Sequence, residues 1–305
     1  MRVYLLFLVV VLASHPGISQ ICNPVLDLTF GSSGLAIGSS STGPATPPWS
    51  AKIMVQADNK IVQVCRLAEA ENRFGLIRYK SNGTFDSSFG NNGKVTTLVG
   101  ARSAANTGLI QPDGKILVAG VGDSASGAAN FALARYNSDG TLDNSFGAGG
   151  TVLSKIGRYY EYISDIALQA DGKIIAVGSS SDSNYISAFA TVRYHPDGRI
   201  DSSFGTNGKV IAHLGPFISH IGTVFYGVYS FENANAVLVQ GDGKIVVLGN
   251  SYIINGCFDY YGWVYCNPAF GMTRYNSNGT VDSSFGIGGK VVDSVNLYYV
   301  SAAAL

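Results

Sequence analysis

The sequence repeats itself four times, and this repetition restricts the chain to an array of one structural unit. The clearest copy runs from Gln111 to Gly150 and reads QPDGKILVAG, a variable loop, and NFALARYNSDGTLDNSFGAGG. The other copies occupy 56–93, 169–208 and 240–289. The repeat phenylalanines, at positions 30, 89, 146, 204 and 285, are 59, 57, 58 and 81 residues apart. The basic period is therefore about 58 residues, and the last copy carries an insertion of about 23.

Each copy has the pattern of four short β-strands. Around the clearest copy, the first strand ends at 109–111, the second covers 115–120, the third covers 131–136 and the fourth begins at 151–153. Asp-Gly and Asn-Gly pairs between them supply the positive φ angles that tight hairpins require. The second strands (KILVAG, KIIAVG, KIVVLG) are apolar on both faces, so they must be covered on both sides. No stretch has a helical period, which predicts an all-β chain.

Sheets that are covered on both faces pack side by side around an axis in a β-propeller. We therefore predict a β-propeller of four-stranded antiparallel blades, with four complete blades and one split or incomplete blade. The predicted blades are about 51–100, 104–157, 162–215 and 233–295, with a fourth-strand fragment at 24–38 and the start of a further blade at 298–305. The two missing strands of the split blade indicate a fragment of a longer protein. The alternative is an open arc of four blades with two exposed apolar faces.

The repeated sequence motifs resemble those of the delta-60 repeat β-propeller family. The resemblance covers roughly residues 23–305 and depends on QPDGKILVAG, FALARYNSDGTLDNSFGAGG and their copies. It implies a propeller fold, which in this family often belongs to exported or surface proteins. It implies no general catalytic activity, so no active-site residue is carried over.

Residues 1–19 are predicted to be a signal peptide. Arg2 precedes an apolar run over 3–13 that is too short to span a bilayer, and small residues at 17 and 19 fit cleavage before Gln20. The alternative is an N-terminal membrane anchor. We expect a secreted repeat domain over 20–305, with no membrane span after cleavage.

Four cysteines, at positions 22, 65, 257 and 266, remain after that cut. An even number in an exported chain predicts disulfides, with three possible pairings. Cys257 and Cys266 lie nine residues apart in one inserted loop and form the expected bridge, which leaves Cys22 for Cys65. No Cys-x-x-Cys spacing is present, and we expect no metal and no cofactor. Lys and Arg equal Asp and Glu in number, at 20 each, without a basic cluster, so no nucleic-acid partner is expected.

One arginine and one aspartate recur in every copy at a spacing of eight residues. The arginines are Arg78, Arg135, Arg193 and Arg274, and the aspartates are Asp86, Asp143, Asp201 and Asp282. A ring of ligands for a substrate is one interpretation. Structural ion pairs are the preferred one, because stacked units need the same internal contacts each time and a buried arginine requires a carboxylate.

The turn before each aspartate has two further interpretations. Residues 137–143 (NSDGTLD) weakly resemble a calcium loop but lack its regular oxygen ligands and distal Glu, so a hairpin turn is preferred. Asn82 and Asn278 are each followed by Gly-Thr and are possible glycosylation acceptors.

Departures from the repeat are the main indications of function. Two insertions, 216–231 (PFISHIGTVFYGVYSF) and part of the loop 251–268 (SYIINGCFDYYGWVYCNP), flank one blade and are expected on one face. Tyr and Trp present an apolar face with a polar tip, which suits glycan or protein partners. The predicted ligand-binding residues are Tyr226, Tyr229, Tyr260, Tyr261 and Trp263. The alternative is that these rings pack the two loops against each other.

The sequence thus predicts a secreted, non-enzymatic binding or scaffold module for a glycan or an extracellular protein. The alternative is an extracellular enzyme, such as a carbohydrate-active hydrolase with carboxylates on the loop face. Asp123, Asp182 and Asp259 lie in equivalent loops and are its candidate carboxylates. No catalytic constellation is recognisable, so no catalytic residue is assigned.

Overall fold

A computed structural model describes residues 29–30, 49–67, 72–157, 159–182, 187–214, 232–260 and 263–293. Within these ranges the regular structure consists of sixteen β-strands. Over the same residues there is no helix with the length and hydropathy needed to cross a membrane.

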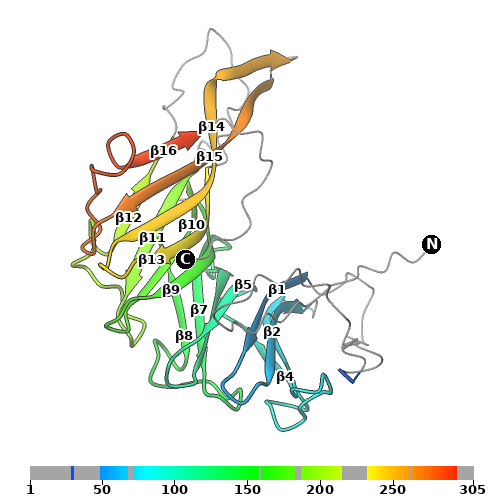
Figure 1. The fold of residues 1–305 in the computed structure, drawn as a ribbon. Helices are drawn as coiled ribbons and strands as arrows, with labels where there is room; N and C mark the ends of the chain where they lie inside the picture. Colours follow the sequence, from blue (N-terminus) through cyan, green and yellow to red (C-terminus); the bar gives the residue numbers. More distant parts are fainter. Residues whose placement is uncertain are drawn as a thin grey trace.

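The strands fall into four consecutive groups of four, here named units 1 to 4 (Figure 1). Unit 1 contains β1 (Trp49–Val55), β2 (Ile61–Leu67), β3 (Arg73–Tyr79) and β4 (Lys94–Thr97). Unit 2 contains β5 (Ser103–Ile110), β6 (Ile116–Asp123), β7 (Ala129–Tyr136) and β8 (Thr151–Ser154). Unit 3 contains β9 (Tyr160–Leu168), β10 (Ile174–Ser181), β11 (Ser187–Tyr194) and β12 (Lys209–Ala212). Unit 4 contains β13 (Asn233–Val239), β14 (Ile245–Tyr260), β15 (Trp263–Tyr275) and β16 (Lys290–Asp293).

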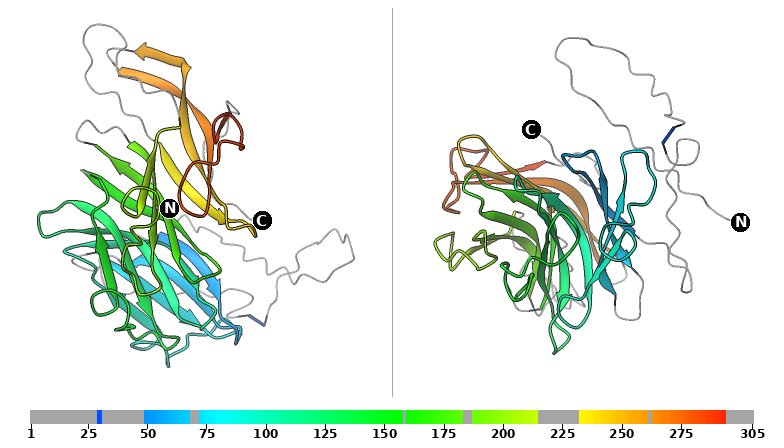
Figure 2. Two further views of the ribbon diagram at one scale, coloured as in Figure 1. Left: turned by 90° about the vertical axis from the view of Figure 1, so that its left-hand side faces the viewer. Right: turned by 90° about the horizontal axis from the view of Figure 1, so that it is seen from below.

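Each unit is an antiparallel meander in which every strand pairs with the next one along the chain. A single parallel pairing, Ala129 with Tyr160, joins units 2 and 3 into one eight-stranded sheet. Units 1 and 4 are separate four-stranded sheets. Figure 2 shows the sheets following one another in chain order, and the first strands β1, β5, β9 and β13 contact each other in sequence. The fold is therefore all-β with several stacked antiparallel sheets, as in a propeller. The described residues form no closed ring of sheets.

The hydrophobic core lies between the units. In the first cluster, Val62 and Leu76 of unit 1 pack with Ile116 and Tyr136 of unit 2. Two further clusters join unit 2 to unit 3 and unit 3 to unit 4 in the same way. The second strands are buried on both faces, as their uninterrupted apolar pattern indicates. Burial of each large side chain here is worth roughly 1.5–3 kcal/mol, so the units depend on one another for their stability.

The insertion in unit 4 differs from the sequence-based expectation of a loop at 251–268. The structure continues β14 and β15 through this segment as a long hairpin, which projects beyond the rest of its sheet (Figure 1). The strand register passes from Ile253 opposite Asn267 to Phe258 opposite Tyr265, so four residues bulge out of β14 against one in β15. The segment is rich in aromatic and β-branched residues, which favour strands, and the extended pairing satisfies the backbone of both arms.

Candidate functional site

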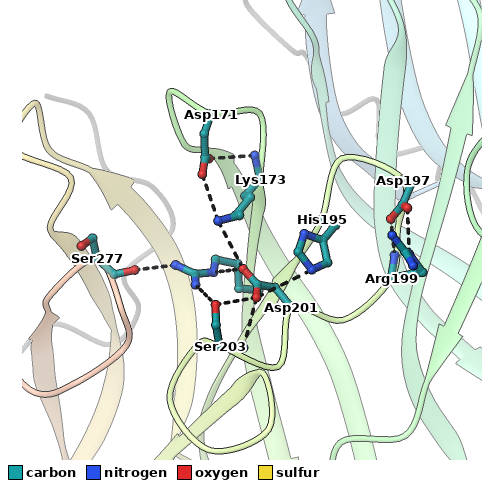
Figure 3. Close-up of polar contacts among 9 residues, drawn as sticks. Asp171, Lys173, His195, Asp197, Arg199, Asp201, Ser203 and Ser277 are labelled. Atoms are coloured by element: carbon teal, nitrogen blue, oxygen red, sulfur yellow. Dashed lines mark hydrogen bonds and ion pairs between the residues drawn. The ribbon is translucent and has the colours of Figure 1, made fainter.

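The repeated arginine and aspartate lie together in every unit. The distance from the arginine Nε to the aspartate Oδ2 is 2.9, 2.7, 2.8 and 2.8 Å in units 1 to 4. The serine two residues after each aspartate donates its hydroxyl to Oδ1 at 2.6 to 2.7 Å. Figure 3 shows this arrangement around Asp201 and Ser203 of unit 3. In each unit, the third strand and the turn that follows it thus hold one compact polar cluster of arginine, aspartate and serine.

Each of the first three arginines also reaches into the next unit. Arg78 Nη1 donates to the carbonyl oxygen of Ser138, Arg135 Nη1 to that of Pro196, and Arg193 Nη1 to that of Ser277, each at 2.5 Å. A glycine amide makes a second contact beside the arginine: Gly147 N donates to the carbonyl oxygen of Asp197, the residue after Pro196, at 2.8 Å. The guanidinium also stacks over the repeat phenylalanine, 4.5 Å from the ring centroid for Arg135 over Phe146. The eight-residue spacing indicated the ion pair, but no sequence signal identified a main-chain carbonyl as the third partner.

The aspartates of these clusters are held ionised. Burial raises the pKa of Asp143, but hydrogen bonds from Ser145 and Lys115 and the charge of Arg135 outweigh it and leave the pKa well below its ordinary value. The pKa of Asp201 is lowered in the same way, against burial, by Ser203, Arg193 and Lys173. Because the donors of Arg135 already meet Asp143, Ser145 and Pro196, they are committed to protein groups. This geometry favours a structural role, in which the arginine and aspartate hold the units together, over a ring of substrate ligands.

The candidate calcium loop folds as a hairpin turn. Asp139 Oδ1 accepts hydrogen bonds from the backbone and hydroxyl of Thr141 at 2.9 and 2.7 Å. Where the structure describes the chain, no group of three or more His, Cys, Asp or Glu side chains is placed to hold a metal ion. The possible glycosylation acceptors Asn82 and Asn278 lie in equivalent exposed turns, where each Oδ1 is bonded to a threonine.

The cysteines are only partly within the described residues. Cys65 is fully buried and forms no disulfide with another described residue, and burial raises the pKa of its thiol to about 11. Its predicted partner Cys22 lies outside the described residues, so that pairing stays a prediction. Cys257 and Cys266 lie on β14 and β15, one position before and after the paired residues Phe258 and Tyr265.

The predicted aromatic residues are likewise only partly covered. Tyr226, Tyr229 and Tyr261 lie outside the described residues. Tyr260 and Trp263 are paired backbone partners at the tip of the projecting hairpin. Asn233, where β13 begins, pairs with Asn250 at the base of the hairpin extension, so the chain leaving the first insertion arrives at the same edge of unit 4. The backbone therefore brings the ends of both insertions to one edge, but the described residues do not establish a shared aromatic surface.

A polar row on the first strands was missed by the sequence analysis. Asp165 on β9 accepts from Thr107 Oγ1 of unit 2 at 3.2 Å and from the Val237 amide of unit 4 at 3.1 Å. Asn106 Nδ2 donates to the Ile163 carbonyl at 2.8 Å. Burial raises the pKa of Asp165. These residues connect three units, and the recurrence of polar side chains before the apolar half of each first strand was the signal that could have revealed them.

The candidate carboxylates of the enzymatic alternative have different surroundings. Asp123 ends β6 and accepts from Arg102 Nε at 2.7 Å. Asp182 follows β10, whereas Asp259 is paired through its backbone with Val264 on the projecting hairpin. The first of these groups is therefore engaged in an ion pair, and the third lies beyond the body of its sheet.

Comparison with known proteins supports the same class of fold. The family model described as "Domain of unknown function (DUF5122) beta-propeller" matches residues 56–89, 111–146, 169–204 and 262–285, which follow the four copies. These matches and the stacked antiparallel sheets support a β-propeller repeat family. No curated protein matches the chain in sequence.

Similar solved structures are distant. A gluconolactonase from Xanthomonas campestris is 13% identical, with a TM-score of 0.39, and the match covers 83% of this chain and 64% of that one. A mannose phosphorylase from Leishmania mexicana is 9% identical, with a TM-score of 0.35 and coverage of 64% and 61%. The GH43_1 enzyme from Xanthomonas citri, complexed with xylotriose, is 10% identical, with a TM-score of 0.34 and coverage of 82% and 87%. The chain thus spans 64% and 61% of the length of the first two, and likeness at this level assigns no activity.

Proposed function

We propose that this chain is a secreted β-propeller of the delta-60 repeat type that acts as a non-enzymatic binding or scaffold module. The projecting hairpin of β14 and β15 is the observation that carries the proposal, because it is the largest described departure from the repeat. The repeated motifs themselves are engaged in contacts within and between units. Function is then expected where the units differ.

A glycan or an extracellular protein is the expected ligand. The hairpin tip joins Tyr260 to Trp263 across the strands, next to Tyr261 in the sequence. Such residues bury a large apolar area while keeping a polar group available, and they dominate many recognition surfaces. A hairpin held by main-chain pairing presents them at a low cost in conformational entropy.

A disulfide between Cys257 and Cys266 would support this role. The two residues flank the paired positions Phe258 and Tyr265 on neighbouring strands, and a bridge there would fasten the arms of the hairpin beside its bulge. Disulfides persist in exported proteins, so the bridge also accords with secretion. Mass spectrometry of a non-reduced digest is expected to show the peptide pair joined; free thiols at both positions would contradict it.

The binding role is tested by screening the purified protein on a glycan array and against surface proteins of its source. A variant carrying Tyr261→Ser and Trp263→Ser is expected to lose at least tenfold in affinity, while Val55→Ser, an exposed apolar change outside the hairpin, leaves binding unchanged. Equal binding by all three proteins would refute the hairpin as the binding element. Release of sugar from a bound glycan would instead favour the hydrolase alternative.

A further inference from the structure

A buried glutamate connects the ends of the two insertions. Glu232, which is 4% exposed, follows the insertion 216–231 in the sequence and directly precedes β13. Its carboxylate accepts from the Leu214 amide at 3.1 and 3.2 Å and from the Ser251 hydroxyl at 2.8 Å. Leu214 lies before the first insertion, and Ser251 lies where β14 continues into the projecting hairpin (Figure 1). One carboxylate thus joins both sides of the first insertion to the base of the hairpin.

Units 2 and 3 have a counterpart of this contact without an insertion. In unit 3, Glu161 is 1% exposed and accepts from the Ile156 amide at 2.6 Å and from the Gly157 amide. In unit 2 the same position is taken by Ser103, whose hydroxyl accepts from the Val99 amide at 3.2 Å. Each of these units therefore has a side-chain acceptor for the chain that enters its first strand, and in unit 4 this acceptor also bonds the hairpin.

The residue before each bonded amide changes together with the acceptor. It is Leu98 beside the serine of unit 2, Lys155 beside the glutamate of unit 3 and His213 beside the glutamate of unit 4. The Nδ1 atom of His213 lies 3.4 Å from Glu232 Oε2. Burial raises the pKa of Glu161, and the charge of Lys155 is among the influences that oppose this rise. A basic residue thus accompanies each of the two carboxylates, and the one in unit 4 is of the type that changes charge near neutral pH.

We propose that His213 and Glu232 form a pH-sensitive joint that holds the projecting hairpin more firmly in mildly acidic than in mildly alkaline solution. A carboxylate partner favours the charged form of a histidine. The stabilisation by the ion pair is therefore present below about pH 6 and is lost as the pH rises through the neutral range. Once the imidazole is neutral, the buried carboxylate lacks this counter-charge, which weakens the arrangement that it holds together.

Three further described groups face this pair. Lys290 of β16 donates to the main-chain oxygen of His213 at 2.6 Å. Ser179 of β10 donates to the main-chain oxygen of Glu232 at 3.1 Å, and Ser251 of β14 donates to its carboxylate. The serines do not titrate in this range, and a lysine keeps its charge through it, so Lys290 opposes protonation of His213 to the same extent throughout. Glu232 faces the imidazole itself and favours its protonation.

For ligand binding, the joint rests on the proposed function, because it acts on the hairpin to which binding is assigned. Its effect on the hairpin can be measured without any ligand. A chain that binds no glycan and no surface protein would contradict the proposed function and leave the joint standing, so the two failures are distinguishable.

Hydrogen exchange of single amides at pH 6 and pH 8, corrected for the intrinsic effect of pH on exchange, tests the proposal. The Leu214 amide and the amides of the hairpin over 252–267 are expected to exchange about threefold faster, or more, at pH 8. The Ile156 amide is the internal control, because a lysine precedes it, and is expected to exchange equally at both values. Equal exchange at pH 6 and pH 8 for Leu214 or for the hairpin would overturn the proposal.

Two substitutions identify the titrating group. His213→Lys keeps a positive charge at both pH values and is expected to abolish the pH dependence of exchange at Leu214 and in the hairpin. Lys155→Met is the matched control, because it removes the basic residue of unit 3 and is expected to leave that dependence unchanged. His213 is half-buried and Lys155 is exposed, so neither change disturbs the core. A His213→Lys protein that keeps the native pH dependence would show that another group titrates and would overturn the proposal.

Discussion

Arg135 of unit 2 and Pro196 of unit 3 are joined by a hydrogen bond of 2.5 Å from the guanidinium Nη1 to the main-chain carbonyl oxygen. The same guanidinium is paired with Asp143 in its own unit and stacks over Phe146. One side chain therefore fixes the local turn and binds the neighbouring sheet. The predictions below follow from this contact and from the surfaces around it.

Arg135→Met is expected to destabilise the fold by about 2–3 kcal/mol, because it removes a buried charge-assisted hydrogen bond and leaves Asp143 with Lys115 alone for a counter-charge. Arg199→Met, which breaks only an exposed pair, is expected to cost less than about 1 kcal/mol. Urea unfolding measures both. Equal midpoints for the two variants would show that the inter-unit contact adds nothing.

Low pH is expected to reduce the stability of the fold, because it protonates the aspartates of these arginine–aspartate clusters. The pKa values of Asp143, Asp201 and Asp282 lie below their ordinary value of 3.8 in the folded state. Their stabilisation is therefore fully present above about pH 4 and is lost as the pH falls through the folded values. Thermal unfolding between pH 7 and pH 2 should show a falling midpoint below pH 4. The fall should be smaller in Asp143→Asn, which starts from a lower stability.

Gly198→Ala tests the close packing of one unit on another. Gly198 has a φ of 89°, and an added Cβ would lie 2.8 Å from Val152 and 2.9 Å from Phe146. Strained backbone and crowding together are expected to cost about 2–4 kcal/mol. Gly127→Ala, at a φ of 82° with open space around it, isolates the backbone part, about 1–2 kcal/mol. The difference between the two unfolding free energies is the packing effect; no difference would mean that Val152 and Phe146 shift without strain.

Asp165 is expected to tolerate an amide better than a truncation. Asn can keep an oxygen toward the Val237 amide and an NH₂ group toward Thr107, whereas Ala leaves the amide of the buried Val237 without its partner. Burial already opposes the ionised carboxyl, so loss of its charge costs little. We expect Asp165→Ala to lose about 1–3 kcal/mol and Asp165→Asn less than about 1 kcal/mol in urea unfolding. An equal loss of stability in the two variants would show that the charge itself stabilises the three units.

The sequence carried most of the information on architecture and less on the site. Doubly apolar strands such as Ile116–Asp123 and the Asp-Gly turns indicated stacked sheets, since both signals are local. The contact between Arg135 and Pro196 O was not visible, because every residue has a main-chain carbonyl and only the fold selects one. The sequence does not distinguish the extended hairpin from a loop, because aromatic residues such as Tyr260 and Trp263 suit a strand and a binding loop equally well.

The use of main-chain carbonyls as acceptors has a consequence for how such repeats diverge. Serine at 138 and 277 and proline at 196 present the same oxygen to an arginine, so the side chain there is not constrained by the contact. The side chains of the turn can change during evolution while the hydrogen bond from the arginine to its main-chain carbonyl is kept. The main-chain oxygen of one residue therefore maintains the contact between units, while its side chain is free to vary, so the turn sequence can change without weakening the packing of the units.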